Sequence, residues 1–305
     1  MKTACKSFQA ALRSASVLSG GQDLSDQILQ LAHRIEKGLT IASPKAMWGW
    51  KKAWELAGLL EKADKDSFAY QTGGGVLYAY LAAKKQTGDP QELSEAEKLE
   101  LSLTEKNMPL CDNGTGGAIA IQKEQIRLSE AEMSAVEKLF FTRHSVRDFD
   151  NTDVSEEAIM QAVQWASRCP SACNRQPFRM YVVGAADRKN LGFENELSAD
   201  KYVLITGRIS AYKTTEFNDW IVSATIFAAY LSLALHAYGI GSCVMRKDLI
   251  KETQYNVAMR RFCGIPQNEQ IVLELAIGNY KEHFAVPVSN RMPAEEIVDF
   301  VRGKE

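Results

Sequence analysis

Two polar clusters constrain this chain more than any other part of its sequence: Arg143–Phe149, the first island, and Ser171–Phe178, the second island. Between them the apolar residues repeat with the spacing of one short amphipathic helix, which ends before Pro170. The capping box Ser129–Glu132 predicts a helix that buries Met133, Val136 and Phe140 and leads into the first island. The second island leads into an apolar run, Phe178–Val183, that is typical of a strand. Each polar cluster is therefore expected directly after a helix end.

The residue types of the two islands suit a phosphate and the polar edge of a ring. In an extended segment Arg143, Ser145 and Arg147 alternate onto one side, which presents two guanidinium groups and a hydroxyl together. The second island adds groups that both donate and accept hydrogen bonds, as the uracil-like edge of a flavin requires: Ser171, Asn174 and Gln176. We interpret the pair as a cradle for flavin mononucleotide (FMN). For the first island alone, a solvated arginine-rich loop is the alternative.

Composition excludes several classes of partner. The chain has 305 residues, a formal net charge of −2 and a pI near 6.2, which give no electrostatic case for nucleic acid or an anionic membrane as the main partner. We expect a small-molecule or protein partner and no metal. Its six cysteines are too sparse for a disulfide scaffold, which favours a reduced, cytoplasmic compartment. Cys169 and Cys173 have a CxxxC spacing, and two buried small residues one turn apart is a simpler interpretation than a redox pair. The Ser-rich first 22 residues are weakly transit-peptide-like, and we treat them as a lead-in.

The first 117 residues predict an all-α domain. Apolar residues at helical spacing begin after Asp23 and stop at Gly38, where a helix would end. Further helices are expected over three stretches: Trp48–Ala63, around Tyr70–Lys85, and from the capping box Ser94–Glu97. The turn-rich segment Cys111–Gly117 is the best linker candidate, which divides the chain into domains 1–117 and 118–305.

Two features of this half allow more than one interpretation. Gly73–Gly75 could offer backbone amides to an anion, but without a preceding strand or a Lys-Ser/Thr pair a packing or helix-start role is favoured. The string His33–Leu39 clusters ionisable groups at a helix end. It is either a solvated face closed by Gly38 as a C-cap, or a segment that closes over the flavin or contacts a partner.

The uncharged run Trp220–Tyr238 is long enough to consider a membrane span. Ser223, Ser232 and His236 interrupt it and no basic cluster flanks it, so a helix buried in a globule or dimer is favoured and no membrane span is predicted. Apolar, β-branched runs elsewhere predict further strands: Tyr202–Thr206 and Ile271–Ile277.

The two islands together resemble the paired motif of the FMN-dependent nitroreductase family. The resemblance spans about Ser129 to Phe300 and includes Gly239–Cys243 and Glu274–Tyr280. The string His33–Leu39 resembles an amino-terminal extension of nitroreductase-like proteins associated with polysaccharide biosynthesis. The chain departs from the family pattern near Arg291, where a second basic residue is common, and in having a helical amino-terminal half.

This resemblance implies an α+β fold: a mostly antiparallel sheet of four or five strands wrapped by helices, preceded by the all-α domain. It implies an intertwined homodimer with FMN at the interface. Arg143, Ser145 and Arg291 would hold the phosphate, and Ser171, Asn174 and Gln176 would come from the other subunit. The FMN-binding residues implied are Arg143, His144, Ser145, Arg147, Ser171, Ala172, Asn174, Gln176, Asn195, Val244, Met245, Arg246 and Arg291.

The activity implied is transfer of a hydride from NAD(P)H, through flavin N5, to an electron-poor acceptor of the nitroaromatic or quinone type, by a ping-pong mechanism. Flavin carries the chemistry, so no side chain is predicted to be catalytic. Two alternatives stay open. One is a flavoenzyme dedicated to a single metabolite, such as a sugar or polysaccharide precursor, and the other is a non-catalytic interaction protein on a flavin-binding scaffold.

Overall fold

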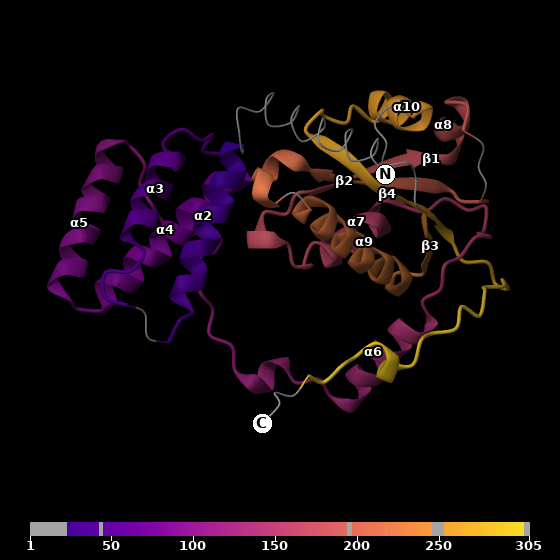
Figure 1. The fold of residues 1–305 in the computed structure, drawn as a ribbon, viewed down its shortest axis with the longest axis horizontal. Coiled ribbons are helices and arrows are strands. Elements are labelled where there is room, and N and C mark those ends of the chain that lie inside the picture. The colour runs from indigo at the N-terminus through magenta and orange to yellow at the C-terminus, as the bar shows by residue number, and fades with distance from the viewer. Residues whose placement is uncertain (1–22, 43–44, 194–196, 217, 246–252, 302–305) are drawn as a thin grey trace.

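The computed structural model describes residues 23–42, 45–193, 197–216, 218–245 and 253–301, and shows a helical bundle beside a helix-covered sheet (Figure 1). This arrangement confirms the predicted α+β fold preceded by an all-α region. The predicted lead-in and two predicted site residues, Asn195 and Arg246, lie outside the described residues.

The amino-terminal bundle consists of α2 (Leu24–Leu39), α3 (Trp50–Leu60), α4 (Phe68–Gln86) and α5 (Pro90–Glu105). Their apolar faces form one core, into which Lys84 and Glu92 are also buried as an ion pair of 2.7 Å. The Lys84 ammonium lies over the rings of Trp48, Trp50 and Tyr80, and the Trp50 indole donates to Glu92. Because every charge in this group has a partner, the buried pair is compatible with a stable core.

The predicted start of α5 at Ser94 is wrong. The helix begins at Pro90, because the Asp89 carboxylate accepts from the backbone amide of Gln91 at 2.8 Å and Pro90 occupies the first helical turn. Ser94 lies inside the helix, so its capping-box pattern is not used.

Glycines of the bundle allow close packing. Gly38 lies inside α2 rather than capping it, and a Cβ there would lie 2.0 Å from the Trp48 ring. Gly73–Gly75 lie inside α4, and a Cβ on Gly75 would lie 2.4 Å from Asn113 Oδ1. The packing interpretation of Gly73–Gly75 is therefore confirmed, whereas the interpretation of Gly38 as a C-cap is wrong. The predicted linker folds back onto α4, where the Thr115 hydroxyl donates to the carbonyl of Gln71 at 2.9 Å. The boundary at residue 117 stays a prediction.

The sheet contains β1 (Phe178–Gly184), β2 (Lys201–Arg208), β3 (Ile240–Met245) and β4 (Glu269–Asn279), in the order β1-β2-β4-β3 with every pairing antiparallel. The three predicted strands are confirmed. One face of the sheet is covered by α7 (Glu156–Ala166) and α9 (Asp219–Ala237), and the other by α8 (Ala185–Asn190) and α10 (Gln254–Cys263).

The apolar run Trp220–Tyr238 forms α9, which packs against α7 and the sheet. Among the described residues it is the one helix of sufficient length and apolarity to cross a membrane, and half of its apolar stretch is buried within the fold. These contacts favour the interpretation of α9 as a core helix.

Helix α6 (Glu130–Thr142) begins at the predicted capping box, in which Ser129 and Glu132 bond each other reciprocally. The prediction that its apolar face is buried is wrong for the single chain: Met133, Val136 and Phe140 are 54%, 39% and 59% exposed. Figure 1 shows α6 lying apart from the sheet, and the carboxy-terminal segment 281–301 running from the end of β4 towards α6. Helical spacing identified an apolar face, and the described part of a single chain leaves more than a third of each of these side chains exposed.

Matched glycine substitutions test the packing of α4. A Cβ on Gly75 would collide with Asn113 and Thr115, whereas a Cβ on Gly58, also inside a helix, meets nothing within 4 Å. We expect Gly75→Ala to lower the free energy of unfolding by about 1 to 3 kcal/mol. We expect Gly58→Ala to raise it by about 0.5 to 1 kcal/mol, because alanine favours helix. Denaturant unfolding measures both, and stabilisation by Gly75→Ala would contradict the packing.

Candidate functional site

The first island is held along the edge strand β3. The backbone amide of Val146 donates to the carbonyl of Ser242 at 3.0 Å, and Ser145 and Ser242 form a parallel bridge. Phe149, fully buried, fits over Gly241 and Gly278, which are paired across β3 and β4. A Cβ on Gly278 would lie 2.7 Å from Phe149, so the paired glycines leave the space that this ring fills. The first island is therefore fixed at both its middle and its end.

The first island lines a cavity of about 760 Å³ at the junction of α6, α9, β3 and the carboxy-terminal segment. Five of the predicted FMN-binding residues lie in its wall: Arg143, His144, Ser145, Val244 and Arg291. They come from three distant parts of the chain, so folding brings together what the sequence keeps apart.

The walls of this cavity are chemically unequal. Arg143, Arg291 and the hydroxyl of Ser145 supply cationic and hydrogen-bonding groups, whereas Leu233 and Val244 supply an apolar surface. Charge-assisted hydrogen bonds to an anion contribute roughly 1.5 to 3 kcal/mol each. The arrangement suits a ligand that joins a phosphate to a flat, largely apolar group.

Other predicted site residues lie elsewhere. Arg147 is exposed, and its guanidinium donates to the carbonyl of Ser145 at 3.3 Å. Met245 packs against the buried cluster that contains Val146 and Phe149. None of the predicted second-island residues lines the cavity: Ser171, Ala172, Asn174 and Gln176. Within one chain the structure therefore assembles one part of the predicted cradle.

The second island has an unusual backbone. Cys173, Asn174 and Gln176 have φ angles of 52°, 50° and 45°, in the left-handed region that non-glycine residues seldom adopt. Each such residue costs of order 1 kcal/mol or more, so surrounding contacts must hold it. Ser171 supplies two of these contacts. Its hydroxyl accepts from the backbone amide of Gln176 at 3.1 Å, and its carbonyl accepts from the backbone amide of Asn174 at 3.0 Å.

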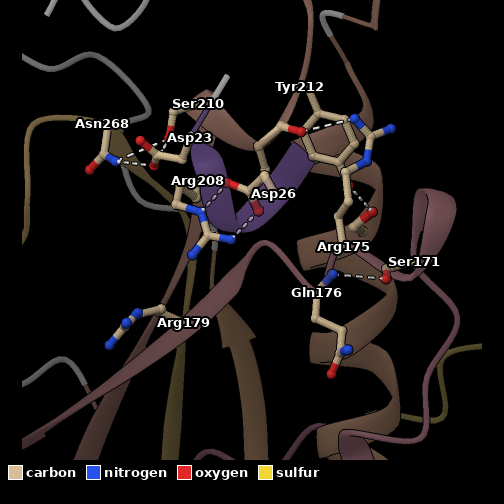
Figure 2. Close-up of polar contacts among 12 residues, drawn as sticks. Asp23, Asp26, Ser171, Arg175, Gln176, Arg179, Arg208, Ser210, Tyr212 and Asn268 are labelled. Atoms are coloured by element: carbon tan, nitrogen blue, oxygen red, sulfur yellow. Dashed lines mark hydrogen bonds and ion pairs between the residues drawn. The ribbon is translucent and has the colours of Figure 1, made fainter. Parts of the chain in front are cut away.

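Arg175 supplies the strongest of these contacts. Its side chain is 1% exposed and lies beside Tyr212 (Figure 2). Its guanidinium donates to the carbonyls of Ala172 at 3.0 Å and Ala211 at 2.8 Å and forms a bidentate pair with Glu216. It also stacks 4.0 Å from the ring centre of Tyr212. The hydrogen bond from Arg175 holds the pKa of Glu216 below its usual value, against the opposing effect of burial. Sequence reasoning missed Arg175, because its partners are 36 and 41 residues away.

A hydrogen-bonded chain beside the cavity was also missed. The His236 ring lies 2.8 Å from the Thr142 hydroxyl and 2.8 Å from the Tyr280 hydroxyl, which joins the ends of α6, α9 and β4. Burial lowers the pKa of His236, and the nearby charges of Arg143 and His144 lower it further. His236 is therefore neutral at neutral pH. Its polar character within an apolar run was the available signal.

Comparisons with known proteins concern this part of the chain. Residues 141–201, which contain both islands, match the family model described as the nitroreductase family. A protein of Archaeoglobus fulgidus that is named as an NADH dehydrogenase/NAD(P)H nitroreductase is 27% identical over 159 residues. The match covers 48% of this chain and 85% of that protein. The iodotyrosine deiodinase of Hydra vulgaris is 25% identical over 252 residues, covering 68% and 89%. A solved structure from Desulfovibrio desulfuricans, assigned as a nitroreductase in complex with FMN, is 20% identical with a TM-score of 0.46 and covers 55% and 98%.

Acid should weaken the ion pair between Arg175 and Glu216, which helps to fix the second island. Because the folded pKa of Glu216 lies below its usual 4.5, the ion pair contributes fully above pH 4.5, and its contribution is lost as the pH falls through the lowered pKa. We expect Glu216→Gln to cost about 2 kcal/mol at pH 7 and to flatten the acid dependence of unfolding.

Denaturant unfolding between pH 7 and pH 3 measures this effect. Glu61→Gln, which removes an exposed pair with Lys106, is the control and should change stability by less than about 0.5 kcal/mol. Equal losses at pH 7 in the two variants would show that Arg175 does not depend on Glu216.

Proposed function

We propose that this protein, whose residues 141–201 belong to the nitroreductase family, is an FMN-dependent oxidoreductase. The family match confirms the resemblance predicted from the paired motif. The observation that carries the proposal is the cavity in which Arg143, Ser145 and Arg291 meet an apolar wall. Two guanidinium groups and a hydroxyl fit a phosphate, and the apolar wall fits one face of a flavin ring.

Different residues of the cavity would contact different parts of FMN. Arg143, Ser145 and Arg291 would bind the phosphate, and the chain around Val244 would run along the ring near N5. Arg147, next along the first island, would place its charge at the N1/O2 side. A cation there stabilises negative charge added to the ring, and would raise the reduction potential. The hydrogen bond between neutral His236 and Thr142 would keep the end of α6 in place beside the phosphate.

We extend the proposal to a homodimer in which each site uses both chains. Two observations support it. The second island does not line the cavity of its own chain, and the uncovered face of α6 forms an apolar hollow of about 740 Å³ that includes Met133, Val136 and Phe140. A second copy would cover α6 and bring the partner's second island, with its predicted hydroxyl and amide groups, to the ring.

When bound, FMN would accept a hydride at N5 from NAD(P)H and reduce an electron-poor acceptor in a second half-reaction. The chain's part is to bind and orient both reactants. No general acid is needed where solvent protonates the product.

The acceptor is the open part of the proposal. One relative is named for NAD(P)H and nitro reduction and another for iodotyrosine deiodination, so the shared cradle is compatible with broad or dedicated acceptors. Steady-state assays with generic quinones and nitroaromatics separate the two: good turnover supports a broad reductase, and poor turnover by an FMN-loaded, NAD(P)H-reducible protein supports the dedicated enzyme. A dimer that cannot be loaded with FMN would favour the interaction protein. Cytoplasmic location is part of this proposal.

Loss of the phosphate anchor should release the cofactor. We expect the wild-type chain to purify with flavin absorbance that bleaches with NAD(P)H in the absence of oxygen. Arg143→Ala should weaken FMN binding by about tenfold to a hundredfold, because one charge-assisted contact is removed. Arg261→Ala, at an exposed arginine on α10, is the control and should retain the wild-type flavin content. Full flavin content in Arg143→Ala would mean that the phosphate lies elsewhere.

A further inference from the structure

The bundle is attached to the sheet domain through the first turn of α2. Asp23 is the N-cap residue of α2, yet its side chain makes no capping hydrogen bond to its own helix. Its carboxylate instead accepts from the hydroxyl of Ser210 at 2.9 Å and from the amide of Asn268 at 3.5 Å. Acidic residues at a helix start usually face solvent or cap the helix. Here the Asp23 side chain instead binds the sheet domain.

Asp26, one turn further along α2, makes a stronger contact with the sheet domain. It is fully buried, and its carboxylate accepts two hydrogen bonds from the guanidinium of Arg208, one of them 3.1 Å long (Figure 2). A buried carboxylate requires such a partner, because an unpaired charge in the interior is strongly destabilising. The ion pair is therefore a fixed joint between the bundle and the end of β2.

The same joint reaches the second island. The backbone amide of Arg208 donates to the carbonyl of Pro177 at 2.8 Å, and the carbonyl of Ala211 accepts from Arg175 at 2.8 Å. The four-residue turn Arg208–Ala211 is thus bound on one side by Asp23 and Asp26 and on the other by the second island. Helix α2 also packs directly against the short helix η2 (Ala172–Asn174) of that island.

We propose that Asp26 is a positioning residue for FMN, through which the amino-terminal bundle holds the second island in its left-handed conformation. The inference rests on the proposed function, in which Asn174 and Gln176 contact the flavin. Both residues have positive φ angles that relax unless their surroundings over-determine them. The turn Arg208–Ala211 is part of those surroundings, and Asp26 fixes it. The bundle thus has a role at the flavin site without contributing a side chain that touches the cofactor.

The test uses the full chain and two matched amide substitutions. Asp26→Asn removes the charge that pairs with Arg208, and Glu100→Gln removes the charge that pairs with Lys85 at 2.7 Å on the exposed side of the same bundle. Hydrogen exchange of residues 171–178 is measured in the FMN-free proteins. FMN affinity and the visible circular dichroism of bound FMN are then measured for each variant.

We expect exchange at 171–178 to rise about tenfold in Asp26→Asn, with FMN affinity falling and the dichroism changing, and no change in Glu100→Gln. Asp26→Glu, which retains the charge, should recover most of the affinity. Unchanged exchange at 171–178 in a folded Asp26→Asn protein would overturn the inference, as would increased exchange with unchanged affinity and dichroism.

A second variant covers the case in which Asp26→Asn does not fold. Ser210→Ala removes the hydrogen bond to Asp23 without leaving a buried charge, and should give the same changes at smaller amplitude. No change in Ser210→Ala would then overturn the inference. A wild-type chain that binds no FMN would refute the proposed function separately, because exchange in the FMN-free protein still reports whether α2 holds the second island.

Discussion

The buried guanidinium of Arg175 is the contact on which the second island depends. It satisfies the carbonyls of Ala172 and Ala211, pairs with Glu216 and stacks on Tyr212, so one side chain joins the island to the turn after β2. A buried arginine is tolerated only where its hydrogen bonds are made, and these bonds fix the backbone on both sides of it. The left-handed residues around it can then persist.

The first island depends on a different constraint, which is the absence of side chains at Gly241 and Gly278. These paired glycines leave space for Phe149, while β3 binds the backbone of Val146. The two islands are thus fixed by independent devices, one by packing against the sheet and one by a buried charge. What a single chain does not do is bring them to the same cavity, and the uncovered face of α6 lies beside that cavity.

Local physical signals predicted much of the fold. The capping box at Ser129 and the β-branched runs depend on a few neighbouring residues, and these predictions were confirmed. No local pattern links Arg143 and Ser145 to Arg291; the family resemblance grouped them, and the three residues line one cavity. Burial of Phe140 was predicted wrongly, because periodicity identifies an apolar face without saying what covers it. Gly38 was interpreted as a C-cap. Its lack of a side chain instead leaves space for the ring of Trp48, which lies ten residues further along the chain. Arg175 and Asp26 left no local pattern, because their partners are distant in sequence.

Subunit complementation tests the shared cradle most directly. Arg143→Ala impairs the first island and Asn174→Gly impairs the second while allowing its left-handed backbone. Each homodimer should lose FMN. In a heterodimer of the two variants, purified through different tags, one site would carry both lesions and the other none, so about one FMN per dimer should bind. No FMN in the heterodimer would show that both islands serve the same chain, and would contradict the account.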